Sequence, residues 1–468
     1  MQTLRIVVLA ALFALIGLLF YTSFFKPTAS ERMPLRTLRG RMHPPFTLPA
    51  PISFAHDRLN AGARLKAVVE LPDFISRHPD ATFNSLFIVE RKSAHLKIPG
   101  TFADKVKKMF ARYPGGTDDI SFIENQNIVT TYNRFTDEYS LFNEIRRYRP
   151  GYMEKLPAED EEKVELIMNE TAGADKCDFC RMDRSAEDVF GRVVGDHCFT
   201  ASNVAKYEQW HGLVIGKQHH PLIMDPAVIG DYIATSKRWF QKVHELDVEA
   251  RFPHAMYDAG PRASASQIHS HMQISITHDR FYSKAEHARQ AAIDYEEENV
   301  GRNYWQDVAH VHESLGLAIR NGRSMVISHL CPVKEREIIV VTESSDDPSF
   351  AETIAIALQA LKDDVGTRAF SMAVLFEEIP LNTATEENKD DEVLVNSRTS
   401  RKFRRESSGK ADRLARSYPA LARIVDRGNP LDRRSDVGAM EFFGANNVGA
   451  DPYHIMPFLR NRLLKKLG

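Results

Sequence analysis

The sequence predicts an α+β protein with two tandem lobes, each an antiparallel sheet with packed helices. The first lobe is indicated between residues 210 and 277, where a strand-like stretch, a long helical stretch and two more strand-like stretches follow one another. The order strand, helix, strand returns between residues 337 and 378, which indicates an internal repeat. The chain of 468 residues is long enough for two or three domains, and its 43% hydrophobic and 26% charged residues are ordinary for a globular protein.

The N-terminal end carries a nearly unbroken apolar run, Ile6–Phe25, of about the length that spans a bilayer. A cleaved signal peptide is the alternative, but the run is long for one and no A-x-A cleavage site follows. We therefore expect residues 1–26 to be a transmembrane anchor, which would make this a single-pass membrane protein. Basic residues gather after the run, so the positive-inside rule places the body in the cytosol. A glycosylation sequon at Asn169 keeps the lumenal side open.

After the anchor, the Pro- and Arg-rich residues 27–53 are expected to form an extended tether. Residues 54–150 then form an N-terminal extension with globular composition. It contains a helix-like stretch at Phe102–Arg112 and a strand-like stretch at Asn127–Tyr132. The net charge of the whole chain, −2, gives no general attraction to nucleic acid, so the expected partners are small molecules.

The first motif with chemical content is the C-x-x-C pair of Cys177 and Cys180. Two thiolates at this spacing can reach one tetrahedral metal ion, with imidazoles from elsewhere completing the site. A redox pair has the same spacing, but no βαβ pattern surrounds this one. A strand ending in a polar turn follows at Trp210–His219. Apolar residues at helical spacing then predict a helix over Pro226–Leu246, and His254–Asp258 returns as a strand.

The motif at the centre of the chain is a strand-like stretch, residues 268–276, in which apolar and polar residues alternate. Side chains two apart on a strand share a face, so His269, His271 and Gln273 are expected to point the same way. The loop before them contains Gly260 and several small residues, whose backbone N–H groups can approach a ligand closely. Imidazoles beside such a loop favour phosphate chemistry.

The segment GPRASASQIHSHMQ, residues 260–273, resembles the active-site segment of the histidine-triad superfamily. It has the His-x-His-x-Gln form of galactose-1-phosphate uridylyltransferase and diadenosine tetraphosphate phosphorylase (ATP adenylyltransferase). The resemblance implies that His271 is the nucleophile that takes up a nucleoside monophosphate and that Gln273 contacts the transferred phosphate. The substrate-binding residues that this segment and the superfamily's nucleotide-contacting asparagine indicate are Asn203, Gly260, Ser264, Ser266 and Gln267.

The same resemblance implies a structural zinc ion. In the uridylyltransferase branch the ligands are a C-x-x-C pair, a His after the next long strand and the first His of the His-x-His motif. The matching residues here are Cys177, Cys180, His219 and His269, with His220 as the alternative to His219.

The two lobes are expected to be residues 151–300, which carry the motif, and residues 301–468. In the second lobe, Glu337–Glu343, Asp347–Asp363 and Ser371–Glu378 match the first strand, the helix and the return strand. No His-x-His-x-Gln follows them, so this lobe is expected to be degenerate. The uridylyltransferases also have a catalytically silent second half.

Two further segments complete the second lobe. Residues 385–417 are highly charged with few apolar residues, which predicts a disordered insertion. The stretch VGAMEFFGA falls where the uridylyltransferases have a strand near the sugar, which implies that Glu441 forms a hydrogen bond with a substrate hydroxyl.

The function that follows is a nucleotidyltransferase or phosphorylase acting on a nucleoside diphosphate-sugar or related nucleotide. A covalent nucleotidyl-His271 intermediate would pass the nucleotide to phosphate or a sugar phosphate. Two alternatives stay open: a dinucleoside polyphosphate phosphorylase and a catalytically inactive nucleotide-binding protein. Hydrolysis is disfavoured, because hydrolases of the superfamily usually have a third His where Gln273 stands. The resemblance also implies a homodimer.

Overall fold

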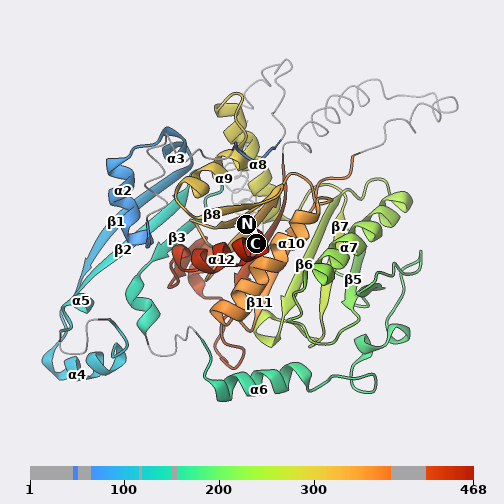
Figure 1. Ribbon diagram of the computed structural model, residues 1–468, viewed down its shortest axis with the longest axis horizontal. Helices are drawn as coiled ribbons and strands as arrows, with labels where there is room; N and C mark the ends of the chain where they lie inside the picture. The colour runs from blue at the N-terminus through green and yellow to red at the C-terminus, as the bar shows by residue number, and fades with distance from the viewer. Residues whose placement is uncertain (1–45, 51–64, 115–118, 150–154, 381–417, 468) are drawn as a thin grey trace, which may run out of the picture. The chain divides into compact units, whose positions relative to one another are not determined.

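The computed structural model describes residues 46–50, 65–114, 119–149, 155–380 and 418–467 (Figure 1). These residues belong to one compact unit, His43–Gly468. The predicted anchor, most of the predicted tether and the predicted insertion at 385–417 lie outside the described residues.

The prediction of a single-pass membrane protein is corrected by the structure. Within the described ranges, no helix is both long enough and apolar enough to cross a bilayer. The longest helix there, α7 (Pro226–Leu246), buries one apolar face in the protein and carries charged residues such as Lys237 and Arg238 elsewhere along its length. The prediction of a cytosolic body, with the lumenal side left open, depended on the anchor and is withdrawn with it.

The main sheet of the described chain has nine strands, and every neighbouring pair in it is antiparallel. In spatial order the strands are β4 (Cys198–Ser202), β5 (Trp210–Gly216), β7 (His271–Thr277), β6 (Phe252–Ala259), β11 (Phe370–Leu375), β12 (Ala420–Asp426), β10 (Ile338–Thr342), β9 (Ser324–Ser328) and β8 (Ala318–Asn321). The predicted α+β class with antiparallel sheet and packed helices is confirmed.

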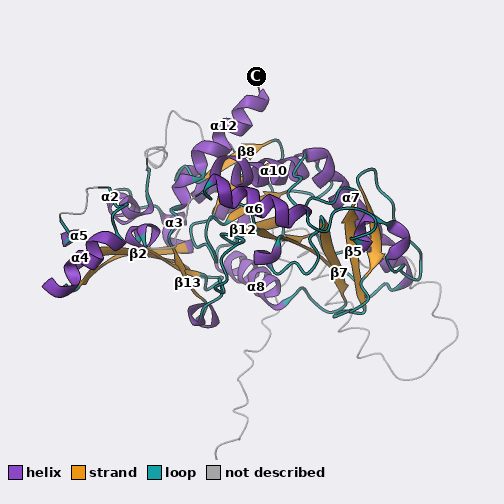
Figure 2. Ribbon diagram, turned by 90° about the horizontal axis from the view of Figure 1, so that it is seen from below, coloured by secondary structure: helices purple, strands orange, loops and turns teal. Residues whose placement is uncertain are grey.

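The two halves of this sheet have the same connectivity. In the first, β5 leads through α7 to β6 and β7; in the second, β10 leads through α10 (Pro348–Gln359) to β11 and β12. The halves join where β6 pairs with β11. Figures 1 and 2 show α7 and α10 beside each other on one face of the sheet. The predicted helix Pro226–Leu246 is confirmed to the residue, and a π-helical turn at Ala360–Val365 extends α10.

Successive side chains of β7 point to opposite faces of the sheet, one packed against α7 and the other away from it. Met272, Ile274 and Ile276 are buried in the hydrophobic core with α7, because residues two apart share a face. His271 and Gln273 therefore lie on the face away from α7. The strand begins at His271, later than the predicted strand at residues 268–276, so His269 precedes the strand instead of sharing its face.

A second, smaller sheet joins the two ends of the described chain. Its order is β1 (Phe87–His95), β2 (Asn125–Asn133), β3 (Tyr139–Phe142) and β13 (Ala445–Val448), and β13 pairs with β3 in parallel. The remaining α-helices of the described residues are α2 (Leu71–Arg77), α3 (Ala81–Leu86), α4 (Gly100–Met109), α5 (Ser121–Glu124), α6 (Ala158–Asn169), α8 (Ser283–Glu298), α9 (Tyr304–Ser314) and α12 (Met456–Leu467).

Strand register identifies which residue of the second half corresponds to Gln273. Gln273 pairs with Met256 of β6, Met256 pairs with Ala373 of β11, and Ala373 pairs with Arg423 of β12. This row is symmetric about the β6–β11 contact, so Arg423 stands at the position of Gln273. Leu421, two residues earlier, stands at the position of His271.

Arg423 is the centre of a buried ionic network. It donates to Glu138 at 2.6 Å and to Glu337 at 2.6 Å, and His329 Nε2 lies 3.1 Å from the second oxygen of Glu138. Burial alone would raise the pKa of Glu138, but Arg423 and His329 hold that pKa well below its usual value. In the second half, paired charges thus fill the position that Gln273 occupies in the first.

We expect Arg423→Met to lower the free energy of unfolding by about 3–5 kcal/mol, because it leaves two carboxylates buried without their cation. Urea denaturation measures this. Arg434→Met is the matched control: its side chain is 69% exposed and paired with Asp432, so it is expected to cost under about 1 kcal/mol. Equal losses in the two variants would contradict the prediction.

The same network predicts that the free energy of unfolding depends on pH. A carboxylate whose pKa is depressed on folding stabilises the fold above its unfolded pKa, and this contribution is lost as the pH falls through the folded pKa. Wild type is therefore expected to lose more stability than Glu138→Gln when the pH is lowered from 7 into the acid range. Parallel urea midpoints for the two proteins across that range would contradict this.

Candidate functional site

His271 opens β7 on the sheet face away from α7. Its Nδ1 lies 2.7 Å from the backbone carbonyl oxygen of His269, so Nδ1 carries the proton and donates. This leaves Nε2 with its lone pair. Burial lowers the pKa of His271, while the His269 carbonyl and the charge of Asp258 oppose that shift. The geometry therefore favours a neutral imidazole with Nε2 available.

Gln273 is held by a histidine of the neighbouring strand. His211 of β5 accepts the Tyr207 backbone N–H at Nδ1 (3.4 Å), so its Nε2 carries the proton and donates to Gln273 Oε1 at 3.2 Å. The carbonyl oxygen of the Gln273 amide is thereby engaged, which leaves the NH₂ group to donate elsewhere. The amide nitrogen of Asn203 lies 3.2 Å from the same His211 nitrogen; in this tautomer both groups are donors, so Asn203 lies beside the cluster without a hydrogen bond to His211.

The loop between β6 and β7 contains two residues with positive φ, a backbone conformation that few residue types adopt. Gly260 has φ +85°, and a Cβ there would lie 2.9 Å from the end of the Met168 side chain. Ser264 has φ +68°, in the left-handed region. Ser264, Ser266 and Gln267 are exposed to solvent. The loop thus presents three polar side chains next to the start of β7.

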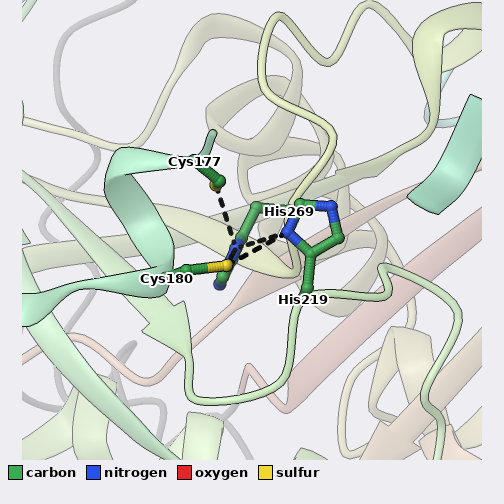
Figure 3. Close-up of side chains that lie close together, drawn as sticks. All are labelled: Cys177, Cys180, His219 and His269. Atoms are coloured by element: carbon green, nitrogen blue, oxygen red, sulfur yellow. Dashed lines mark hydrogen bonds between the residues drawn. The ribbon is translucent and has the colours of Figure 1, made fainter. Parts of the chain in front are cut away.

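The four predicted metal ligands come together (Figure 3). The sulfur of Cys177 lies 3.4 Å from Nδ1 of His269, and the sulfur of Cys180 lies 3.3 Å from Nδ1 of His219. The two Nδ1 atoms are 3.2 Å apart, and all four ligand atoms lie within 4.8 Å of one another. Sulfur and nitrogen ligands at about 2.0–2.3 Å from one ion in a tetrahedron give separations of this size.

The surroundings of the cluster fit a metal site. Nε2 of His269 donates to the carbonyl oxygen of Gly216 at 2.8 Å, which fixes the tautomer and turns the Nδ1 lone pair toward the cluster. Burial lowers the pKa of His269 to about 4, so the ring is neutral, as a ligand requires. His220, the alternative ligand, instead has Nε2 3.1 Å from Glu165 and is not part of the cluster. A metal ion fits Cys177, Cys180, His219 and His269.

One aromatic side chain connects the cluster to His271. Phe179, between the two cysteines, packs edge-on against His271 and His269, with ring centroids 5.3 and 5.8 Å apart. It also covers a small apolar group on β4 and β5. The position of the Phe179 ring therefore depends on the turn that brings the two cysteines together.

The second half of the sheet also reaches this site. Asp258, near the end of β6, accepts a 2.6 Å hydrogen bond from Ser371 of β11, and Arg427 donates to Ser371 at 2.7 Å. Arg427 is itself ion-paired with Asp436 at 2.6 Å. The sequence did not indicate Ser371 or Arg427, because strand pairing between the halves brings them to Asp258.

Glu441 lies in a 3-10 turn, Ala439–Phe443, and not in the strand that the resemblance implied. Its carboxylate accepts from Lys334 at 2.6 Å and from the Gly438 backbone N–H at 2.9 Å. Gly444, in the left-handed region at φ +70°, ends this turn, and β13 begins at the next residue.

No protein-family model matches the chain, and no curated protein sequence matches it. Among solved structures, it is similar to an ADP-glucose phosphorylase from Arabidopsis thaliana with bound ADP-glucose, with a TM-score of 0.50 and 15% identity, over 71% of this chain and 98% of that one. A GalT-like protein from Arabidopsis thaliana has a TM-score of 0.45 and 17% identity, over 61% and 91% of the two chains. Yeast Ap4A phosphorylase in complex with AMP has a TM-score of 0.30 and 11% identity, over 87% and 91%. At 15% identity, the similarity to the ADP-glucose phosphorylase shows the fold alone, and it agrees with the fold that the resemblance implied.

Proposed function

We propose that this protein is a nucleotidyltransferase that cleaves a nucleoside diphosphate-sugar or a related nucleotide, with His271 as the nucleophile. The observation that carries the proposal is the state of His271: its Nδ1 donates to the His269 carbonyl, which leaves Nε2 free to attack. Gln273 stands two residues away on the same strand face, with its NH₂ group left to bind an anionic oxygen.

In the first step, Nε2 of His271 attacks the α-phosphorus of the nucleotide, and a P–N bond forms as the P–O bond to the leaving sugar phosphate breaks. The leaving group departs as a phosphate anion and needs no proton. In the second step, an oxygen of phosphate or a sugar phosphate attacks the same phosphorus, and the P–N bond breaks. The proton stays on Nδ1 throughout, hydrogen-bonded to the His269 carbonyl, so the nucleotidyl-imidazole is cationic and the neutral imidazole leaves readily in the second step.

The chain's other residues would stabilise charge and position the substrate. The Gln273 NH₂ donates to a phosphoryl oxygen, and exposed donors of the loop, including Ser264, Ser266 and Gln267, contact the remaining phosphate oxygens. Asn203 and Gly260 would lie at the nucleotide.

Zinc is the metal that the donor set of Cys177, Cys180, His219 and His269 favours, because two thiolates and two imidazoles in a tetrahedron are typical of structural zinc sites. All four positions are protein ligands, so the ion would have no open position for substrate. These residues then hold the chain around His269, and with it the carbonyl that orients His271.

A substrate panel tests the proposal. The full chain is incubated with nucleotide sugars and dinucleoside polyphosphates, each with inorganic phosphate, and the released nucleoside diphosphate is measured. Turnover of a nucleotide sugar supports the proposal. Turnover of dinucleoside polyphosphates alone would replace it with the second candidate, a dinucleoside polyphosphate phosphorylase, and nucleotide binding without turnover of any substrate or acceptor would favour an inactive nucleotide-binding protein.

The contact between His211 and Gln273 gives a prediction of its own. In His211→Phe the ring remains but both nitrogens are lost, so the Gln273 amide is free to rotate. We expect kcat to fall about tenfold or more, because a misoriented donor no longer stabilises the transition state. His211→Gln retains a side-chain donor and is expected to keep most of the activity. Wild-type kcat in a folded His211→Phe protein would contradict this role.

A further inference from the structure

A cavity of about 340 Å³ opens at the second half of the sheet, away from the candidate site. Its wall combines residues of the β9–β10 connection with residues around α12 and the end of the helical segment after α10. Apolar side chains that line it include Val365, Ile455 and Phe458. This volume is within the range of small-molecule sites.

The cavity is well separated from His271. Glu337, on its wall, immediately precedes β10, while Gln273 lies on β7, with β12, β11 and β6 between them. Four strand spacings of about 4.8 Å correspond to roughly 19 Å. A ligand in the cavity therefore cannot reach the nucleophile.

The three acidic residues of the cavity wall are engaged by other groups. Glu337 is ion-paired with Arg423, and Asp364 with Arg462. Asp451 accepts two backbone N–H groups, at 2.7 and 2.9 Å, and burial raises its pKa to about 6. Their negative charge is therefore largely compensated before any ligand enters.

Three cationic side chains line the same cavity. Arg336 is ion-paired with Asp426, and the guanidinium of Arg147 lies 3.0 Å from Nδ1 of His454. Lys155 is exposed and makes no hydrogen bond or ion pair with the described residues. A phosphate monoester carries the charge and the acceptor oxygens that Lys155 and the Arg147 guanidinium bind.

His329 gives a second, independent indication of the ligand, because one of its ring nitrogens lacks a hydrogen-bond partner. It lines the cavity, is 2% exposed, and its Nδ1 has no partner among the described residues. Its Nε2 lies 3.1 Å from Glu138, so Nε2 carries the proton and Nδ1 is an acceptor. A buried acceptor without a donor is costly, and a ligand hydroxyl would satisfy it.

We propose that this cavity is a second small-molecule site, which binds a phosphorylated sugar or polyol with its phosphate beside Lys155 and Arg147 and a hydroxyl donating to His329. The apolar wall would pack against the carbon skeleton. The site is independent of the chemistry at His271 and of the function proposed for it.

Isothermal titration of the full chain tests this with glucose 6-phosphate as the probe, and with inorganic phosphate and glucose as its two parts. Glucose 6-phosphate is expected to bind at least about tenfold more tightly than either part. It alone carries both a phosphate for the cationic side chains and a sugar hydroxyl for His329. Lys155→Met keeps the aliphatic stem but removes the charge, and is expected to weaken binding by about tenfold.

Two controls separate this site from others. Lys163→Met, in α6, removes an exposed lysine outside the cavity, and Gln273→Ala disables the candidate nucleotide site; both are expected to bind glucose 6-phosphate as wild type does. The proposal is overturned if wild type shows no binding, if inorganic phosphate binds as tightly as glucose 6-phosphate, or if binding survives Lys155→Met but is lost in Gln273→Ala.

Discussion

Replacing His271 with alanine is expected to abolish nucleotidyl transfer. The imidazole Nε2 is the one protein group that forms a covalent bond in the proposed mechanism, and the Nδ1 contact with the His269 carbonyl orients it for that step. Loss of a nucleophile of this kind lowers kcat by about 10⁴-fold or more, because the remaining contacts position the substrate without reacting. The measurement is the phosphate-dependent release of nucleoside diphosphate from the best substrate of the panel.

His220→Ala is a matched control for this variant. His220 directly follows His219, but its two ring nitrogens contact Glu165 and the Leu222 backbone N–H. We expect it to retain nearly full activity, while His271→Ala binds nucleotide and does not turn it over. Activity in His271→Ala within about tenfold of wild type would show that another residue is the nucleophile.

Cys177→Ser is expected to remove the metal ion and to cost at least about 4 kcal/mol of unfolding free energy, because a folded metal site is lost together with its ligand contacts. Cys177 is buried, with its sulfur facing His269. The direct effect is on stability: with four protein ligands the proposed ion has no open position for substrate, so the fraction that keeps the chain around His269 folded is expected to retain turnover.

Zinc content by mass spectrometry and urea denaturation measure the two effects of Cys177→Ser. Cys331→Ala provides the control, since Cys331 is equally buried but lies outside the cluster. It is expected to keep the full zinc content and to lose about 1 kcal/mol. Wild-type protein without zinc, or full zinc content in Cys177→Ser, would contradict the metal assignment.

The site residues that could be predicted from the sequence are those that belong to motifs of closely spaced residues. Two residues separate Cys177 from Cys180, and His269 and His271 share one short motif, so each pair could be recognised without knowing the fold. The tandem order of strands and helices was equally visible, because α7 and its partner strands have strong periodicity.

Other residues of the site depend on contacts that no local pattern encodes. His211 is a single histidine in an apolar strand, and it reaches Gln273 because β5 and β7 are neighbours in one register. Ser371 meets Asp258 only through the pairing of β6 with β11. An alternating stretch also suggested that the strand should include His269, but that residue leaves the strand to join the cysteines.

Membrane attachment was inferred from the length and hydropathy of one apolar run. These two properties do not show whether such a run packs against protein or against lipid. The apolar run Ile6–Phe25 lies outside the described residues, and no helix within them meets the requirements of a span. A long apolar stretch is also what a buried helix of a large protein presents, so length and hydropathy do not distinguish the two cases.

The most direct test of the proposed chemistry is to trap the intermediate. The full chain is mixed with a nucleotide sugar that carries a radiolabel in the α-phosphate, quenched without acceptor, digested and mapped by mass spectrometry. We expect one label, stable in base and lost in acid as a P–N bond is, on the peptide that contains His271. Turnover of the same substrate with no covalent label, or with the label on a peptide that lacks His271, would contradict the nucleotidyl-histidine mechanism.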